Sequence, residues 1–293
     1  MKRILQSALD FLLFSNIFMA LCAVAQALVT FMLIGAKPVP AVLILLFTST
    51  LGIYNFCILI TRPAHPEKSS FRRVRWFFGC RKLMVIFTVL AVVSLVPLFF
   101  MLSLASKILL IFLSILSLAY GFPLFRVDNH QFGLRNIPGL KPFLITLVWT
   151  LSCVLLPVLE AQNQHLSHIS IEDTAILITK RFFFIGALTV PFDIRDLFYD
   201  RQAGLKTIPV AWGEKKAYLF CQILLLAYVI LLFLFRNNGF STDFWALTLT
   251  VAGTGILIFN ARWKKNEYYY FFWLDGVLIF QYLVMLAFNA FFR

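Results

Sequence analysis

The stretch FDIRDLFYDRQAGLKTIP, residues 192–209, places Asp193, Asp196 and Asp200 at the end of a long apolar run. If the run is a helix that continues through this stretch, the spacing i, i+3, i+7 puts the three carboxylates on one face. Carboxylates repel each other and are costly to bring toward lipid, so we expect a cation among them. Their oxygens suit Mg²⁺, whose shell is commonly completed by substrate phosphates. The alternative is a solvated helix end on which acids and bases alternate.

The residues that follow the aspartates fit an anion next to a metal. Arg201 and Lys206 supply positive charge, and Gly204 is expected to end the helix in a left-handed conformation. Such a combination of carboxylates and basic side chains suits a phosphate-containing anion that also binds the metal.

The composition indicates that the chain folds in a membrane. Of the 293 residues, 61% are hydrophobic and 13% charged, whereas charged residues make up about a quarter of soluble domains. The apolar residues form runs long enough to cross a bilayer as helices, without the alternation of a membrane β-barrel. We therefore predict an all-α integral membrane protein, a single domain over 1–293 with nine transmembrane helices. The expected spans are 8–34, 38–60, 83–103, 107–125, 142–160, 174–192, 215–235, 243–261 and 268–291.

The basic residues predict the orientation. With a cytoplasmic N-terminus, twenty of the 26 Lys and Arg residues fall in cytoplasmic segments, as the positive-inside rule requires. The aspartates then face the cytoplasm, in a multi-pass protein of a membrane such as the bacterial inner membrane. The net charge of +13 follows from this topology and requires no nucleic acid. Lys180 and Arg181 fall inside the sixth span and are interpreted as structural.

The stretch from Asp193 to Pro209 resembles the second aspartate-rich motif of the UbiA superfamily of intramembrane prenyltransferases, DxxDxxxDxxxGxKTxP. Nine helices with this motif at the end of the sixth are also that family's plan. The resemblance implies Mg²⁺-dependent transfer of a polyprenyl group from a prenyl diphosphate to an aromatic or other lipid-soluble acceptor. It also implies that two aspartate-rich motifs on facing helices bind Mg²⁺ and the diphosphate.

The first motif departs from the family pattern NxxxDxxxD. In YNFCILITRP, residues 54–63, Asn55 matches, but Leu59 and Pro63 stand where aspartates are expected. We therefore expect one metal site to be missing. Arginine forks can hold phosphate oxygens without a metal, so the basic loop that follows could replace it; the alternative is that these are ordinary positive-inside residues. The loop contains Arg62, Lys68, Arg72, Arg73, Arg75, Arg81 and Lys82.

A further partial match lies at YGFPLFR, residues 120–126, which resembles the family's Tyr followed by a Pro-containing basic turn. The resemblance implies that Tyr120 faces the allylic carbon. The predicted catalytic residues are therefore Tyr120 and Asn55, the predicted diphosphate-binding residues Arg62, Arg72, Arg126, Lys141, Arg201 and Lys206, and the predicted metal ligands Asp193, Asp196 and Asp200.

Two classes of function stay open. The first is an enzyme, either a diverged prenyltransferase or a related prenyl diphosphate cyclase or hydrolase. The second is a non-catalytic isoprenoid-binding or lipid-binding membrane protein that lost the first metal site. The intact aspartates favour the enzyme, and the missing pair favours the second class.

Overall fold

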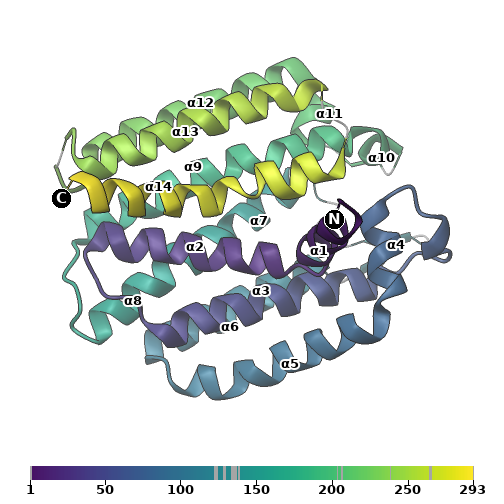
Figure 1. Ribbon diagram of the computed structural model, residues 1–293, viewed down its shortest axis with the longest axis horizontal. Coiled ribbons are helices and arrows are strands. Elements are labelled where there is room, and N and C mark those ends of the chain that lie inside the picture. The colour runs from purple at the N-terminus through teal and green to yellow at the C-terminus, as the bar shows by residue number, and fades with distance from the viewer. Residues whose placement is uncertain are drawn as a thin grey trace.

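The computed structural model describes residues 2–121, 125–127, 130–132, 137, 139–202, 204–205, 207–237, 239–263 and 266–292 (Figure 1). The elements are α1 (Lys2–Phe14), α2 (Ile17–Ile34), α3 (Pro40–Ile60), α4 (Arg72–Gly79), α5 (Arg81–Phe100), α6 (Leu104–Gly121), β1 (Phe125–Val127), β2 (His130–Phe132), α7 (Leu140–Thr150), η3 (Leu151–Leu155), α8 (Leu156–Asn163), α9 (Ile171–Arg195), α10 (Leu197–Gln202), α11 (Ile208–Trp212), α12 (Glu214–Leu234), α13 (Thr242–Asn260), η6 (Tyr269–Leu274) and α14 (Val277–Phe292), with short 3-10 turns at Pro66–Lys68, Phe235–Asn237 and Ala261–Trp263.

The protein is an all-α, multi-pass membrane protein. Within the described residues, eight helical segments are long and apolar enough to cross a bilayer. The 18-residue helix α6 covers most of the remaining expected span, 107–125. That span ends earlier than expected, because Phe125 already belongs to β1, which pairs with β2 in a small antiparallel ribbon.

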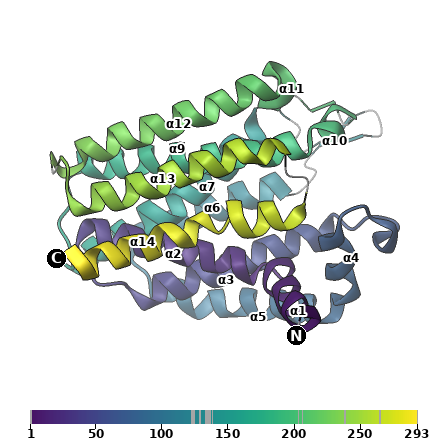
Figure 2. The ribbon, with the colours of Figure 1, turned by 45° about the horizontal axis from the view of Figure 1, so that its top comes forward.

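The long helices run up and down in one bundle (Figures 1 and 2). Helix α9 packs against α7 and α12, while α2 packs against α3 and α14. We call the end of the bundle at which α9 leads into α10 the motif end; α3 and α6 end there, and α5, α7 and α12 begin there. The N-terminus lies at the motif end and the C-terminus at the other end (Figure 1).

The expectation of one helix over 8–34 was wrong. Helix α1 ends at Phe14 and α2 begins at Ile17, because Asn16 adopts a left-handed conformation with φ 67°. Asn tolerates this conformation better than most residues. Its side chain donates a hydrogen bond to Asn55 Oδ1 at 2.6 Å, which ties the break to α3. Only α2 spans the bilayer, and α1 lies against α4 at the motif end (Figure 2).

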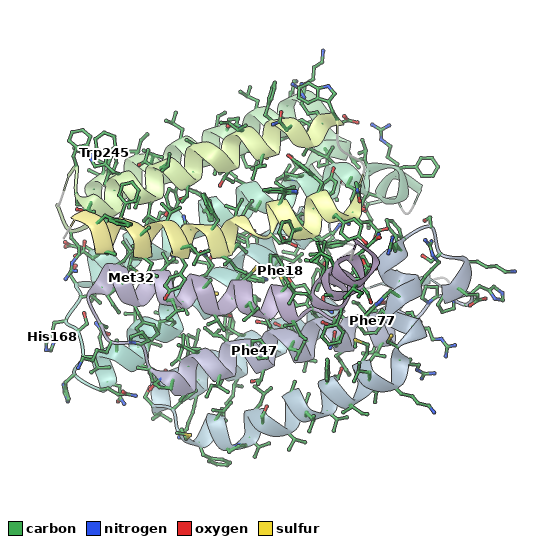
Figure 3. The ribbon with its side chains drawn as sticks, in the orientation of Figure 1. Phe18, Met32, Phe47, Phe77, His168 and Trp245 are labelled. Atoms are coloured by element: carbon green, nitrogen blue, oxygen red, sulfur yellow. The ribbon has the colours of Figure 1, made fainter. Side chains whose placement is uncertain are left out.

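The basic loop contains a helix that the sequence did not predict. Helix α4 begins at Arg72, and the carboxylate of Glu267 accepts hydrogen bonds from the backbone nitrogens of Arg72 at 2.7 Å and Arg73 at 3.0 Å. These two bonds satisfy N–H groups that an isolated helix leaves free. The buried Phe77 (labelled in Figure 3) holds the other end of α4 against the bundle. The loop is thereby fixed to the segment that leads into η6.

The span from α7 to α8 contains the π-helical turn η3, which precedes Pro157. Because Pro157 has no N–H, the carbonyl of Cys153 is free to accept a hydrogen bond from outside its own helix. Thr30 Oγ1 donates that bond at 2.7 Å. A polar contact inside the bundle thus joins this span to α2.

Candidate active site

Two of the three predicted metal ligands lie together around one lysine. Asp193 lies in the last turn of α9 and Asp200 in α10, and both are at least 95% buried. Lys141 enters from the first turn of α7, with Nζ 2.8 Å from Asp193 Oδ1 and 3.9 Å from Asp200 Oδ2. Lys141 was predicted to bind diphosphate; in the structure its ammonium partly neutralises the two carboxylates.

The single positive charge of Lys141 does not balance the two negative charges of Asp193 and Asp200. One lysine faces two carboxylates, with its ammonium 3.9 Å from Asp200 Oδ2. Within the described residues, the buried oxygens Asp193 Oδ2 and Asp200 Oδ2 accept no hydrogen bond. Burial raises the pKa of the Asp200 carboxyl, and the nearby Lys141 lowers it in part. Open carboxylate oxygens are the donors that Mg²⁺ takes, so the residues present fit a hard cation at Asp193 and Asp200.

Asp196 lies between α9 and α10, within electrostatic range of Asp193 and Asp200. Helix α9 ends at Arg195 and α10 begins at Leu197, so the expected spacing along one continuous helix is interrupted. The carboxylate of Asp196 instead accepts two hydrogen bonds from Arg195, from Nε at 2.9 Å and from Nη2 at 3.0 Å. Among the described residues, no group of three or more His, Cys, Asp and Glu side chains is arranged to hold a metal. The expectation of one continuous helix through the three aspartates was therefore wrong. Their role as metal ligands stays a prediction.

The turn after α10 follows the sequence-based expectation. Gly204 has φ +67°, the left-handed conformation in which glycine commonly ends a helix. The backbone nitrogen of Leu205 donates to the carbonyl of Asp200 at 2.9 Å, which closes the turn over the carboxylate pair. Arg201 is exposed, whereas Lys206 lies outside the described residues.

Tyr120 lines a cavity that begins near the carboxylate pair. This cavity, of about 210 Å³, is also lined by Cys57 and Leu144, and Tyr120 lies within electrostatic range of Lys141. A second cavity, of about 400 Å³, continues deeper between α3, α5, α6 and α7. Tyr54 and Trp149 line both cavities, and Trp149 Nε1 donates to the hydroxyl of Tyr54 at 3.1 Å. The lining is mostly apolar, with scattered serines.

The missing first motif has been replaced by a buried polar chain. Asn55 is fully buried on α3. It accepts the bond from Asn16, and Asn16 Oδ1 in turn accepts a hydrogen bond from a guanidinium nitrogen of Arg73. Arg73 was not among the predicted site residues. Its neighbour Arg72, which was, forms an ion pair with Asp10 Oδ2 at 2.5 Å.

Two more residues that the sequence did not nominate lie next to Arg73. Arg195 stacks near Phe271, and the carboxyl of Asp275 lies within electrostatic range of both guanidinium groups. The sequence signal for them was weak: Arg195 stands between two motif aspartates, and Asp275 is an isolated acid in the last span. Of the remaining predicted residues, Arg62 is exposed beside Phe78. The side chain of Arg126 lies outside the described part of the chain.

Solved structures share this architecture. No protein-family model and no curated protein matches the sequence. A UbiA homolog from Archaeoglobus fulgidus bound to GPP and Mg²⁺ superposes with a TM-score of 0.66 at 13% identity, covering 96% of this chain and 99% of that one. The apo structure of a UbiA homolog from Aeropyrum pernix K1 has a TM-score of 0.63 at 14% identity, covering 94% and 98%. At such identities the likeness establishes the fold.

Proposed function

We propose that this chain, which has the fold of UbiA homologues, transfers a polyprenyl group from a prenyl diphosphate to an aromatic or other lipid-soluble acceptor in the membrane. The observation that carries the proposal is the buried Asp193–Asp200 pair, with an open oxygen on each carboxylate, next to an apolar cavity lined by Tyr120. A solved structure with this fold is bound to GPP and Mg²⁺. The distribution of basic residues supports an active site that faces the cytoplasm.

In the proposed reaction the bond between C1 of the prenyl group and the diphosphate oxygen breaks, and its electron pair leaves with the diphosphate. An electron pair of the acceptor forms the new bond to C1, and the acceptor loses a proton. Mg²⁺, when bound, neutralises the charge that develops on the leaving group. Asp193 and Asp200 are its proposed ligands. Asp196 is a third if Arg195 yields its carboxylate.

The other residues act by charge and by exclusion of water. The ammonium of Lys141 reduces the repulsion between the carboxylates of Asp193 and Asp200. In the proposed complex it also adds positive charge next to the diphosphate. Tyr120 lines the cavity proposed for the substrate, and its ring is proposed to stabilise positive charge on the allylic carbon by about 0.5–2 kcal/mol. The apolar cavities hold the polyprenyl chain and keep water from the cation. Arg201, Lys206 and Arg126 remain proposed contacts of the diphosphate.

The test is calorimetric binding of geranyl diphosphate to the detergent-purified chain, with and without Mg²⁺. We expect Mg²⁺ to strengthen binding in the native chain, and Asp193→Asn or Asp200→Asn to remove that increment. Glu172→Gln, an exposed acid at the start of the same helix α9, is the matched control. If Mg²⁺ has no effect on the native chain, the aspartates are structural and the proposal fails.

Turnover separates the two classes of function. Release of diphosphate when an aromatic acceptor is added supports the transferase. Release without an acceptor indicates a hydrolase or cyclase. Tight Mg²⁺-dependent binding with no release under any condition identifies a non-catalytic isoprenoid-binding protein.

A further inference from the structure

Three buried hydrogen-bond donors at the motif end have no hydrogen-bond partner in the described structure: Asn55 Nδ2, Arg73 Nε and Arg195 Nη1. They come from α3, from α4 and from the end of α9. Buried polar groups without partners are few in native proteins, and each needs an explanation. A ligand that brings several acceptor oxygens would satisfy all three.

The three donors belong to one cluster. The guanidinium carbon of Arg73 lies 4.7 Å from the ring centroid of Phe271, and that of Arg195 lies 5.4 Å from the same centroid. Arg73 is also joined through Asn16 to Asn55. The cluster therefore stands at the one residue of α3 that matches the degenerate first motif.

The Arg73 cation is held at a cost. Burial lowers the pKa of the Arg73 guanidinium, and the nearby Asp275 opposes that shift only in part. Arg195 also pairs with Asp196, which leaves its Nη1 free. Arginine forks of this kind bind phosphate oxygens through two parallel hydrogen bonds.

The open atoms of the site are therefore of two kinds. Asp193 Oδ2 and Asp200 Oδ2 are acceptors that call for a cation, and the cluster of Asn55, Arg73 and Arg195 offers donors that call for an anion. Arg195 connects the two sets, because it is the last residue of α9, two positions after Asp193, and its side chain pairs with Asp196. A metal-bound diphosphate is a ligand with both properties.

We propose that Arg73 and Arg195, together with the Asn55 amide, bind phosphate oxygens of the prenyl diphosphate directly and replace the metal site that Leu59 and Pro63 cannot form. The inference rests on the proposed function, since it assigns contacts of that substrate. It confines the metal to Asp193 and Asp200, so that one Mg²⁺ accompanies each diphosphate. Arg73 is then a substrate-binding residue supplied by the basic loop.

The experiment measures binding of geranyl diphosphate to the full chain in detergent by calorimetry, first with EDTA and then with Mg²⁺. We expect the native chain to bind without metal. Arg73→Gln and Arg195→Gln should weaken this metal-free binding about tenfold to a hundredfold. Arg75→Gln removes an exposed arginine from the same helix α4 and should leave it unchanged. Asp200→Asn should lose only the gain from Mg²⁺.

The outcomes separate this inference from the proposed function. If the native chain binds only with Mg²⁺, or if Arg73→Gln and Arg75→Gln bind alike without metal, the arginine site is refuted while the transferase can stand. Titration of two Mg²⁺ per bound diphosphate refutes it as well. If the native chain does not bind geranyl diphosphate even with Mg²⁺, both ideas fail. Should Arg73→Gln prove unfolded by its thermal transition, Arg195→Gln and Arg73→Lys decide the question.

Discussion

Lys141 occupies the space between two carboxylates that the sequence assigned to a metal. Its ammonium lies closer to Asp193 than to Asp200, so it holds the pair together in the absence of a divalent ion. The same lysine competes with that ion, because both are attracted to the same oxygens. The charge balance of the site therefore depends on this one side chain.

Removing the lysine should make the stability of the protein depend on metal. In Lys141→Met two buried carboxylates face each other unpaired, and loss of one partner of a buried ion pair costs about 3–5 kcal/mol. Mg²⁺ that binds only the native state restores about 2.7 kcal/mol at a hundred times its Kd. Thermal unfolding in detergent, with and without Mg²⁺, measures both effects. Lys215→Met, at an exposed lysine of α12, is the control and should respond to neither change.

For Lys180, replacement by methionine is expected to stabilise the protein, in contrast to Lys141→Met. Its amine is fully buried in α9 and has no hydrogen-bond partner among the described residues. The ring centroid of Phe235 lies 4.6 Å from Nζ. The cation–π contact offsets about 0.5–2 kcal/mol, less than the several kcal/mol by which burial penalises a charge. Lys180→Met should therefore raise the unfolding temperature.

The neighbouring arginine is the contrast. Arg181 Nη1 donates to Gln281 Oε1 at 3.2 Å, so Arg181→Met removes a buried hydrogen bond and should lower the unfolding temperature. A lower unfolding temperature for Lys180→Met would show that its amine binds something that stabilises the fold.

Among the elements, α4 is the one whose formation depends on a distant residue. Glu267 caps it across 195 positions of the chain. The cap fixes which arginine points where: Arg72 turns to Asp10, whereas Arg73 turns to Asn16 and Phe271. Consecutive residues on a helix point about 100° apart.

Glu267→Gln should loosen α4 and with it the proposed phosphate contact. A lost helix cap costs about 0.5–2 kcal/mol, and a neutral amide accepts the backbone bonds more weakly than a carboxylate. We expect faster amide hydrogen exchange over 72–79 and weaker metal-free binding of geranyl diphosphate. The increment from Mg²⁺ should be unchanged. Exchange equal to that of Glu172→Gln would contradict a capping role.

The contrast between spans and loops explains what the sequence could predict. The long helices follow from apolar runs of bilayer length, a local signal, and the turn at Gly204 follows from its own residue type. Three other features depend on contacts that the local sequence does not show. The break at Asn16 depends on its bond to Asn55, and helix α4 depends on its cap by Glu267. The interruption at Asp196 goes with its pairing to the neighbouring Arg195. The sequence analysis therefore chose Arg72 as a diphosphate-binding residue, whereas in the structure Arg73 is the arginine that reaches the interior. Lys141 was predicted to bind diphosphate, which stays a prediction, and its contact with both carboxylates was not foreseen.

At the scale of the whole molecule, the fold sets a charged end against an apolar interior. The motif end collects the aspartates and most of the basic residues, and His168 and Trp245 mark the other end (Figure 3). The two cavities between α3, α6 and α7 extend from the motif end into the bundle. A ligand with a diphosphate head and an apolar tail matches this gradient.

The hydrogen-bonded pair of Tyr54 and Trp149 lies where the two cavities meet, so it should set the length of the prenyl tail. On the proposed function, we expect a tail to fill the cavity near Tyr120 first and a longer tail to displace the indole of Trp149. Trp149→Ala merges the cavities and should improve binding of farnesyl relative to geranyl diphosphate, because each further buried Å² of apolar tail contributes about 25 cal/mol.

Calorimetry of dimethylallyl, geranyl and farnesyl diphosphates with Mg²⁺ measures the ranking for each variant. Trp245→Ala removes an exposed indole at the opposite end of the bundle and should keep the native ranking. Tyr54→Phe breaks the hydrogen bond but keeps the ring, so an intermediate ranking is expected. If Trp149→Ala ranks the three donors as the native chain does, the tail does not pass this pair, and the deeper cavity has to be assigned to the acceptor.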